Sequence, residues 1–139
     1  MKDALIKIRS IQINEEDKDE TEIITEGRYE LKGSVCELRY DETEATGYEG
    51  SVTSVKAEHG KWLRMIRAGA ANAELFIEVG RKNYCHYATP YGDMVMGVLA
   101  KSVNADVNED GGRINAEYII DVNSILLGNF SIDIDIKPR

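Results

Sequence analysis

Hydrophobic and polar residues alternate with a period of two along most of the chain. The last segment shows the pattern most clearly, with Phe130, Ile132, Ile134 and Ile136 alternating with Ser131, Asp133 and Asp135. Successive side chains of a β-strand point to opposite faces, so this pattern predicts strands with one face in a core and one in water. A comparable helical period is missing from the sequence.

Ten strands are predicted in this way. Turns rich in glycine separate them, as at Gly33 and Gly60. A change of phase near Ser10 predicts a bulge, and the acidic run Glu15–Glu20 and the stretch Glu44–Gly50 are predicted to be solvated loops. The predicted strands cover residues 4–13, 22–32, 34–42, 50–59, 61–69, 72–79, 83–89, 93–107, 113–122 and 128–137.

So many short antiparallel strands must protect their edges, which leads to a closed barrel or a sandwich. We favour an all-β fold with a single closed antiparallel barrel of about eight to ten strands, in one domain over residues 1–139. Two segments do not fit a strand with one wet face, because residues 61–69 and 93–100 carry apolar side chains on both faces. Their outer faces need cover from a loop, from the N-terminal segment or from a second copy of the chain.

Charge narrows the range of partners. The chain has 139 residues and a formal net charge of -8, which disfavours binding to nucleic acid or to an anionic membrane surface. No leader segment and no long apolar run is apparent, so we expect a cytoplasmic protein. Cys36 and Cys85 lie in alternating apolar runs without metal-ligand spacing, and we expect both to be reduced core thiols.

Motifs for metal binding or catalysis are weak. Residues 106–111 with Glu117 satisfy a calcium-loop expression, but alternating strands flank them in place of helices, so we interpret this segment as a hairpin tip. A zinc site at His59 or His86 would need a third and a fourth ligand from distant strands, and Cys85 and His86 point to opposite faces, so they cannot act as nucleophile and base. Paired carboxylates are expected by chance among so many acidic residues. We therefore expect no metal, no cofactor and no enzymatic activity.

Arg64 and Arg67 are the residues with the clearest chemical interest. One of them must face the barrel interior whichever phase its strand adopts, and a buried guanidinium needs a partner or an anionic ligand. An internal carboxylate such as Glu74 or Glu78 would satisfy it. Tyrosines that share the interior add hydroxyl groups, and they are Tyr29, Tyr40, Tyr87 and Tyr118.

The order of several motifs resembles that of the YwiB-like family of small bacterial proteins, from about residue 27 to residue 136. The motifs are Arg67-Ala68-Gly69, then Tyr87-Ala88-Thr89-Pro90-Tyr91-Gly92, then Glu109-Asp110-Gly111-Gly112-Arg113-Ile114 and Glu117-Tyr118. The resemblance implies a calycin-type β-barrel, similar in architecture to lipocalins and fatty-acid-binding proteins, in an intracellular bacterial protein of uncharacterised function. It supplies no catalytic residues.

Three functions follow from these observations as hypotheses, and the least favoured of them is an enzyme, because no catalytic constellation is visible in the spacing of the residues. In the first, the barrel interior binds a small amphipathic or anionic ligand through Arg67, Tyr87 and Tyr118, without catalysis. In the second, the outer faces of strands 61–69 and 93–100 bind a second copy or another protein. A barrel interior filled by its own side chains would contradict the first hypothesis.

Overall fold

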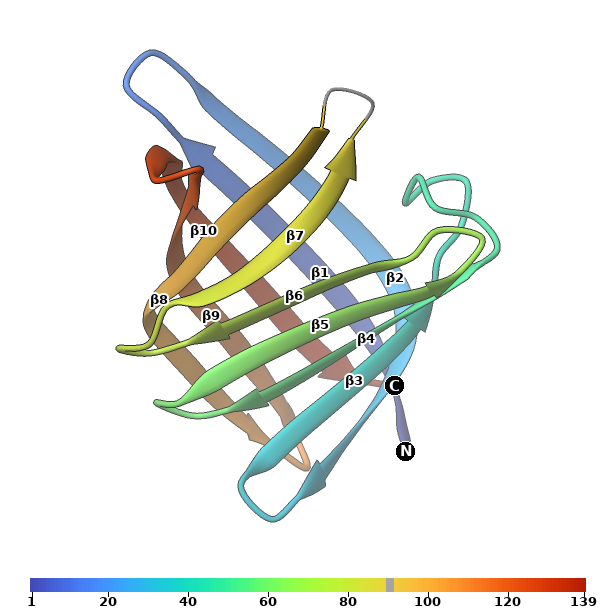
Figure 1. The fold of residues 1–139 in the computed structure, drawn as a ribbon. Coiled ribbons are helices and arrows are strands. Elements are labelled where there is room, and N and C mark those ends of the chain that lie inside the picture. The colour runs from blue at the N-terminus through green and yellow to red at the C-terminus, as the bar shows by residue number, and fades with distance from the viewer. Residues whose placement is uncertain (90–91) are drawn as a thin grey trace.

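The protein is an all-β barrel of ten antiparallel strands (Figure 1). The computed structural model describes the backbone at residues 1–89 and 92–139 and the side chains at residues 1–84, 92 and 94–139. The strands are β1 (Lys2–Ile13), β2 (Lys18–Lys32), β3 (Val35–Asp41), β4 (Ser51–Glu58), β5 (Trp62–Gly69), β6 (Ala73–Glu78), β7 (Asn83–Thr89), β8 (Gly92–Asn108), β9 (Gly111–Val122) and β10 (Ile125–Pro138). All ten predicted strands are therefore present.

The strands form one sheet in the order β6-β5-β4-β3-β2-β1-β10-β9-β8-β7. The first and last strands pair with each other, so the chain termini meet inside the sheet and not at its edge. The edges are β6 and β7, which are neighbours in sequence but diverge in space (Figure 1). The barrel is thus nearly closed, with an open seam between β6 and β7.

One end of this seam is sealed by the β4–β5 turn. The amide of Gly60 donates to the carbonyl of Val103 on β8 at 2.8 Å, and the amide of Ala105 donates to Nδ1 of His59 at 3.0 Å. Val79 adds a parallel bridge to Ala100. The seam is therefore closed at the end near the β4–β5 turn and opens toward the far ends of β7 and β8.

The core fills the barrel away from the open seam. Its fully buried side chains come from strands all around the sheet, and they include Ile6, Leu38, Val55, Leu63, Ile77, Ile114 and Ile134. Tyr29 is buried as well, and its hydroxyl shares its single proton between the carbonyl oxygens of Asn108 and Glu109, each 3.0 Å away. This side chain therefore connects β2 to the β8–β9 turn.

Two local expectations were wrong. The register of β1 runs without interruption from Ala4 to Ile13, so no bulge occurs at Ser10. Ile11 and Ile13 simply fall on the outer face, while the register shifts occur at Ala100/Ser102 and Leu126/Gly128.

Part of the acidic run is also strand, since β2 begins at Lys18 and pairs there with Ile13. Acidic side chains are compatible with this extension because it lies in solvent, where Glu20 forms an ion pair with Arg9. Hairpin pairing is missing between β6 and β7, apart from an isolated bridge between Glu78 and Arg81. The amide of Val79 is instead bonded to the carbonyl of Lys61.

The chain also shows no helix long and apolar enough to cross a membrane within its described residues.

Candidate functional site

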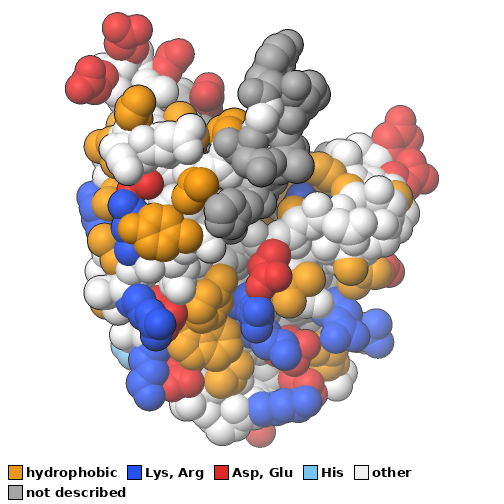
Figure 2. Space-filling model, in the orientation of Figure 1, with side chains coloured by type: hydrophobic (Ala, Val, Ile, Leu, Met, Phe, Trp, Pro, Cys, Tyr) orange, Lys and Arg blue, Asp and Glu red, His pale blue; other side chains and the backbone are white. Residues whose placement is uncertain are grey.

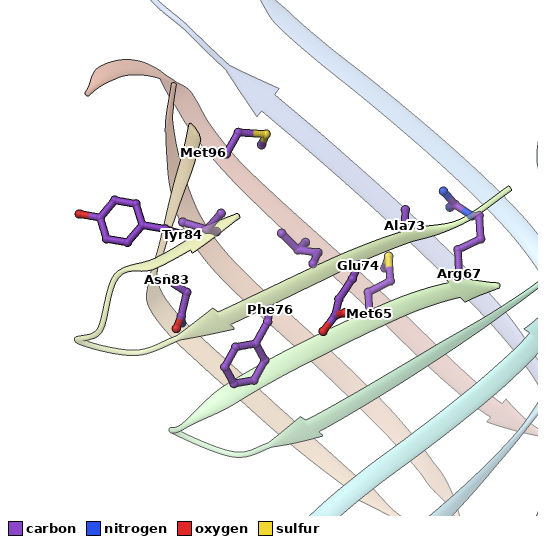
Figure 3. A pocket seen from close by; sticks show the side chains of 10 residues that line it. Met65, Arg67, Ala73, Glu74, Phe76, Asn83, Tyr84 and Met96 are labelled. Carbon is purple, nitrogen blue, oxygen red and sulfur yellow. The ribbon is translucent and has the colours of Figure 1, made fainter. Parts of the chain in front are cut away.

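A cavity of about 430 Å³ lies along the open seam. It is bounded by β5 and β6 on one side and by β7 and β8 on the other. Figure 3 shows its side chains, with Arg67 at one end of the group and Asn83 and Tyr84 at the other. The cavity is lined by Met65, Arg67, Ala73, Glu74, Leu75, Phe76, Asn83, Tyr84, Met96 and Val98.

Apolar side chains form the inner wall of the cavity. Met65 on β5 lies directly opposite Leu75 on β6 in the strand register, and Met96 and Val98 face them from β8. Met65, Leu75 and Met96 are only partly buried although they pack against the core. Methionine is flexible and polarizable, so this wall can adapt to the shape of an apolar guest.

Arg67 enters this site because the alternation of β5 places every second residue inside. Leu63 and Met65 face the core on the same side of the strand, while Arg64 and Ile66 face outward. The Arg67 side chain is 17% exposed. The prediction that one of the two arginines faces inward therefore holds for Arg67.

A buried carboxylate balances the charge of Arg67. Glu42, just after β3, is 1% exposed, and its Oε1 lies 3.5 Å from Nε of Arg67. The same Oε1 accepts a hydrogen bond from Oγ1 of Thr53 at 2.7 Å. On the other side, the guanidinium lies over the ring of Tyr48, 3.6 Å from its centroid, which is a cation–π contact.

The ion pair is incompletely hydrogen-bonded. Among the described side chains, Nε of Arg67 and Oε2 of Glu42 are buried atoms without a hydrogen-bond partner. Burial, together with the charge of Glu42, raises the pKa of the nearby Tyr40 to about 12, so this phenol is neutral. Buried polar atoms without hydrogen-bond partners are uncommon, so charge attraction contributes more to this pair than hydrogen bonding does.

The partner of Arg67 was not the one suggested by sequence. Glu74 lies opposite Ile66 on the outer face, where it binds Arg64 at 2.7 Å. Glu78 accepts a hydrogen bond from Asn83. Glu42 lies in line with β3, where its amide donates to the carbonyl of Ser51, and it meets Arg67 across β4. The two residues are 25 positions apart in the sequence.

The other two predicted ligand-binding residues are not joined to Arg67. Tyr118 stacks on Phe130, with 5.4 Å between ring centroids, and lines a separate cavity of about 170 Å³. Burial raises the pKa of Tyr118 to about 12. The side chain of Tyr87 lies outside the described residues.

These features define the class of the protein as a nearly closed antiparallel β-barrel with a side cavity at its seam. The chain belongs to the family described as "Domain of unknown function (DUF1934)", whose model matches residues 6–134. Among curated proteins it is 26% identical over 113 residues to the "Uncharacterized beta-barrel protein YwiB" of Bacillus subtilis (strain 168), covering 81% of this chain and 78% of that protein. The predicted resemblance to YwiB-like proteins is thereby confirmed.

A solved structure supports the fold independently. The crystal structure of ywiB protein from Bacillus subtilis superposes with a TM-score of 0.70 at 20% sequence identity. The match covers 96% of this chain and 91% of that chain. The all-β barrel predicted from the sequence is confirmed by this similarity.

Proposed function

We propose that this chain is a non-enzymatic binding protein that takes a small amphipathic or anionic molecule into the seam cavity. The observation that carries the proposal is the cavity itself, about 430 Å³ in volume, with an apolar wall and the guanidinium of Arg67 at one end. Small-molecule sites are typically concave, mostly apolar and provided with a few polar groups that fix orientation.

The filled core does not argue against this function. Tyr29, Leu38 and Ile120 occupy the barrel away from the seam, whereas Met65 and Leu75 border open space. A cytoplasmic location and a relationship to calycin proteins remain part of the proposal. The antiparallel meander around the barrel supports the latter.

The test combines native mass spectrometry with a probe-binding assay. A small molecule released when the purified protein is denatured would identify a retained ligand. In parallel, the neutral fluorophore N-phenylnaphthylamine should brighten on binding to the wild-type protein.

A matched pair of variants locates the binding site. Met65→Trp fills the cavity and should abolish the fluorescence increase. Ile66→Trp adds the same bulk one residue away on the outer face, where Ile66 is 37% exposed, and should leave the increase unchanged. Equal behaviour of the two variants, or no binding by the wild type, would refute the proposal.

The alternative function is binding of a second copy or another protein through the outer faces of residues 61–69 and 93–100. The structure gives this alternative limited support, because the outer face of β5 is covered by its own chain. Trp62 packs on Phe76 with 6.1 Å between ring centroids, and Arg64 lies over the same ring. Figure 2 shows the apolar side chains of this side of the molecule interspersed with Lys and Arg. Analytical ultracentrifugation would reveal a dimer if this alternative holds.

A further inference from the structure

We infer that the seam cavity selects ligands with a neutral polar head group, such as a primary alcohol or a carboxamide, over carboxylates and amines. This inference rests on the proposed binding function and, of its amphipathic and anionic ligands, selects the neutral amphipathic ones. It starts from the charges that border the cavity. Arg67 and Glu74 are the charged residues among its described lining side chains.

Both charges are already balanced. Arg67 is paired with the buried Glu42, and Glu74 is paired with Arg64 on the outer face. The cavity therefore offers an incoming ligand no net charge from these residues. A ligand anion gains little from a cation whose charge a neighbouring carboxylate already offsets.

A carboxylate ligand at Arg67 would also meet Glu42. The Glu42 side chain is 1% exposed, so water does not screen it, and two carboxylates at one guanidinium repel each other. An ammonium group would face the guanidinium of Arg67, which lines the cavity whereas Glu42 stands behind it. Either ionic head group is thus disfavoured.

A neutral head group meets neither obstacle. Nε of Arg67 faces Glu42 at 3.5 Å and is buried, but the side chain is 17% exposed and lines the cavity. A guanidinium carries five N–H donors and donates readily to a hydroxyl or amide oxygen. The bond is charge-assisted on the protein side, while the ligand brings no charge that must be desolvated. The apolar wall formed by Met65, Leu75 and Met96 takes the hydrocarbon part of the same molecule.

The experiment is displacement of N-phenylnaphthylamine by three molecules of one chain length: decanol, decanoate and decylamine. For the wild-type protein, decanol should displace the probe at a concentration at least about tenfold lower than decanoate or decylamine. Wild-type preference for decanoate or decylamine, or equal displacement by all three, would overturn the inference.

Glu42→Gln should reverse the order of the neutral and anionic ligands. This variant preserves the shape of the side chain and an acceptor for Thr53, but it leaves Arg67 without a counter-charge. Decanoate should then displace the probe at a concentration about tenfold lower than decanol. An unchanged order in a folded Glu42→Gln protein would overturn the inference.

Glu74→Gln is the control, because it removes a carboxylate from the same cavity lining but from an exposed pair with Arg64. The wild-type order should persist in it. If Glu42→Gln fails to fold, the order in which the three molecules displace the probe from the wild-type protein decides whether the inference holds. Failure of the probe to bind at all would refute the proposed function itself, which is a different result from binding with the wrong head-group preference.

Discussion

Replacing Arg67 by methionine should strongly destabilise the fold, because it leaves the carboxylate of Glu42 buried without a counter-charge. Removing one partner of a buried ion pair costs roughly 3–5 kcal/mol. The lower end applies here, since the Arg67 side chain is 17% exposed and Thr53 still donates to Glu42. We therefore expect a loss of about 3 kcal/mol in the free energy of unfolding.

Arg64→Met is the matched control on the same strand. Arg64 binds Glu74 at 2.7 Å, a shorter distance than the 3.5 Å between Arg67 and Glu42, but these two side chains are 47% and 52% exposed. Exposed ion pairs contribute roughly 0–1 kcal/mol. Burial and not distance should therefore decide which variant loses more stability.

The assay is urea unfolding followed by the fluorescence of Trp62, the single tryptophan. The double variant Arg67→Met with Glu42→Gln should lose less than the sum of the two single variants, by about 1–2 kcal/mol, because removing both charges leaves neither one unpaired. Equal losses for Arg67→Met and Arg64→Met, or strict additivity in the double variant, would refute the reasoning.

Three further predictions concern the fold. Gly112→Ala should lower the free energy of unfolding in urea by more than about 3 kcal/mol, because φ is +153° and a Cβ would meet backbone atoms closer than 3.0 Å. Gly60 has a φ of +75° and open space around it, so Gly60→Ala should cost about 1 kcal/mol. Similar losses for the two variants would contradict this prediction. Burial raises the pKa of Cys36 to about 11, so its thiol should resist iodoacetamide in the native protein at pH 8, as peptide mapping would show. Because the native state keeps this thiol protonated where the unfolded state does not, the free energy of unfolding should fall as pH rises from about 9 toward 11. His59→Leu removes the acceptor of the Ala105 amide, so this amide should exchange its hydrogen about tenfold faster, which corresponds to a loss of about 1.4 kcal/mol in the free energy of local opening. Unchanged exchange would show that the β4–β5 turn seals the seam without this hydrogen bond.

Local patterning accounts for the success of the strand predictions. A period of two depends only on neighbouring residues, and it required one of Arg64 and Arg67 to face inward, which the structure shows to be Arg67, on the same face of β5 as Met65. The same pattern misled at Ser10, because a strand that extends beyond the core carries Ile11 and Ile13 outside without any change of register. Alternation therefore reports a face reliably only where the core lies beside the strand.

The seam and the ion pair were beyond such reasoning. β6 and β7 have the sequence of a hairpin, but which strands pair at the closure depends on how the β4–β5 turn docks on β8, a contact set by the whole barrel. Glu42 continues the buried series Cys36, Leu38 and Tyr40, so the period of two places it inside. Its contact with Arg67 depends in addition on the registers of β3 with β4 and of β4 with β5. Both features arise from contacts between distant parts of the chain, which periodicity does not encode.

The filled core and the seam cavity occupy different parts of the barrel, so ligand binding and stability depend largely on different residues. Most of the fully buried side chains come from strands around the rest of the barrel, and the seal made by Gly60 and His59 closes the barrel at one end without help from the cavity wall. The wall side chains Met65 and Leu75 are partly buried, so they contribute less to the core. Substitutions of these wall residues should alter ligand binding while the fold persists. The Arg67–Glu42 pair should affect both binding and stability, because it is buried and also borders the cavity. For any variant of this pair, the free energy of unfolding and the head-group preference of the ligand must therefore both be measured.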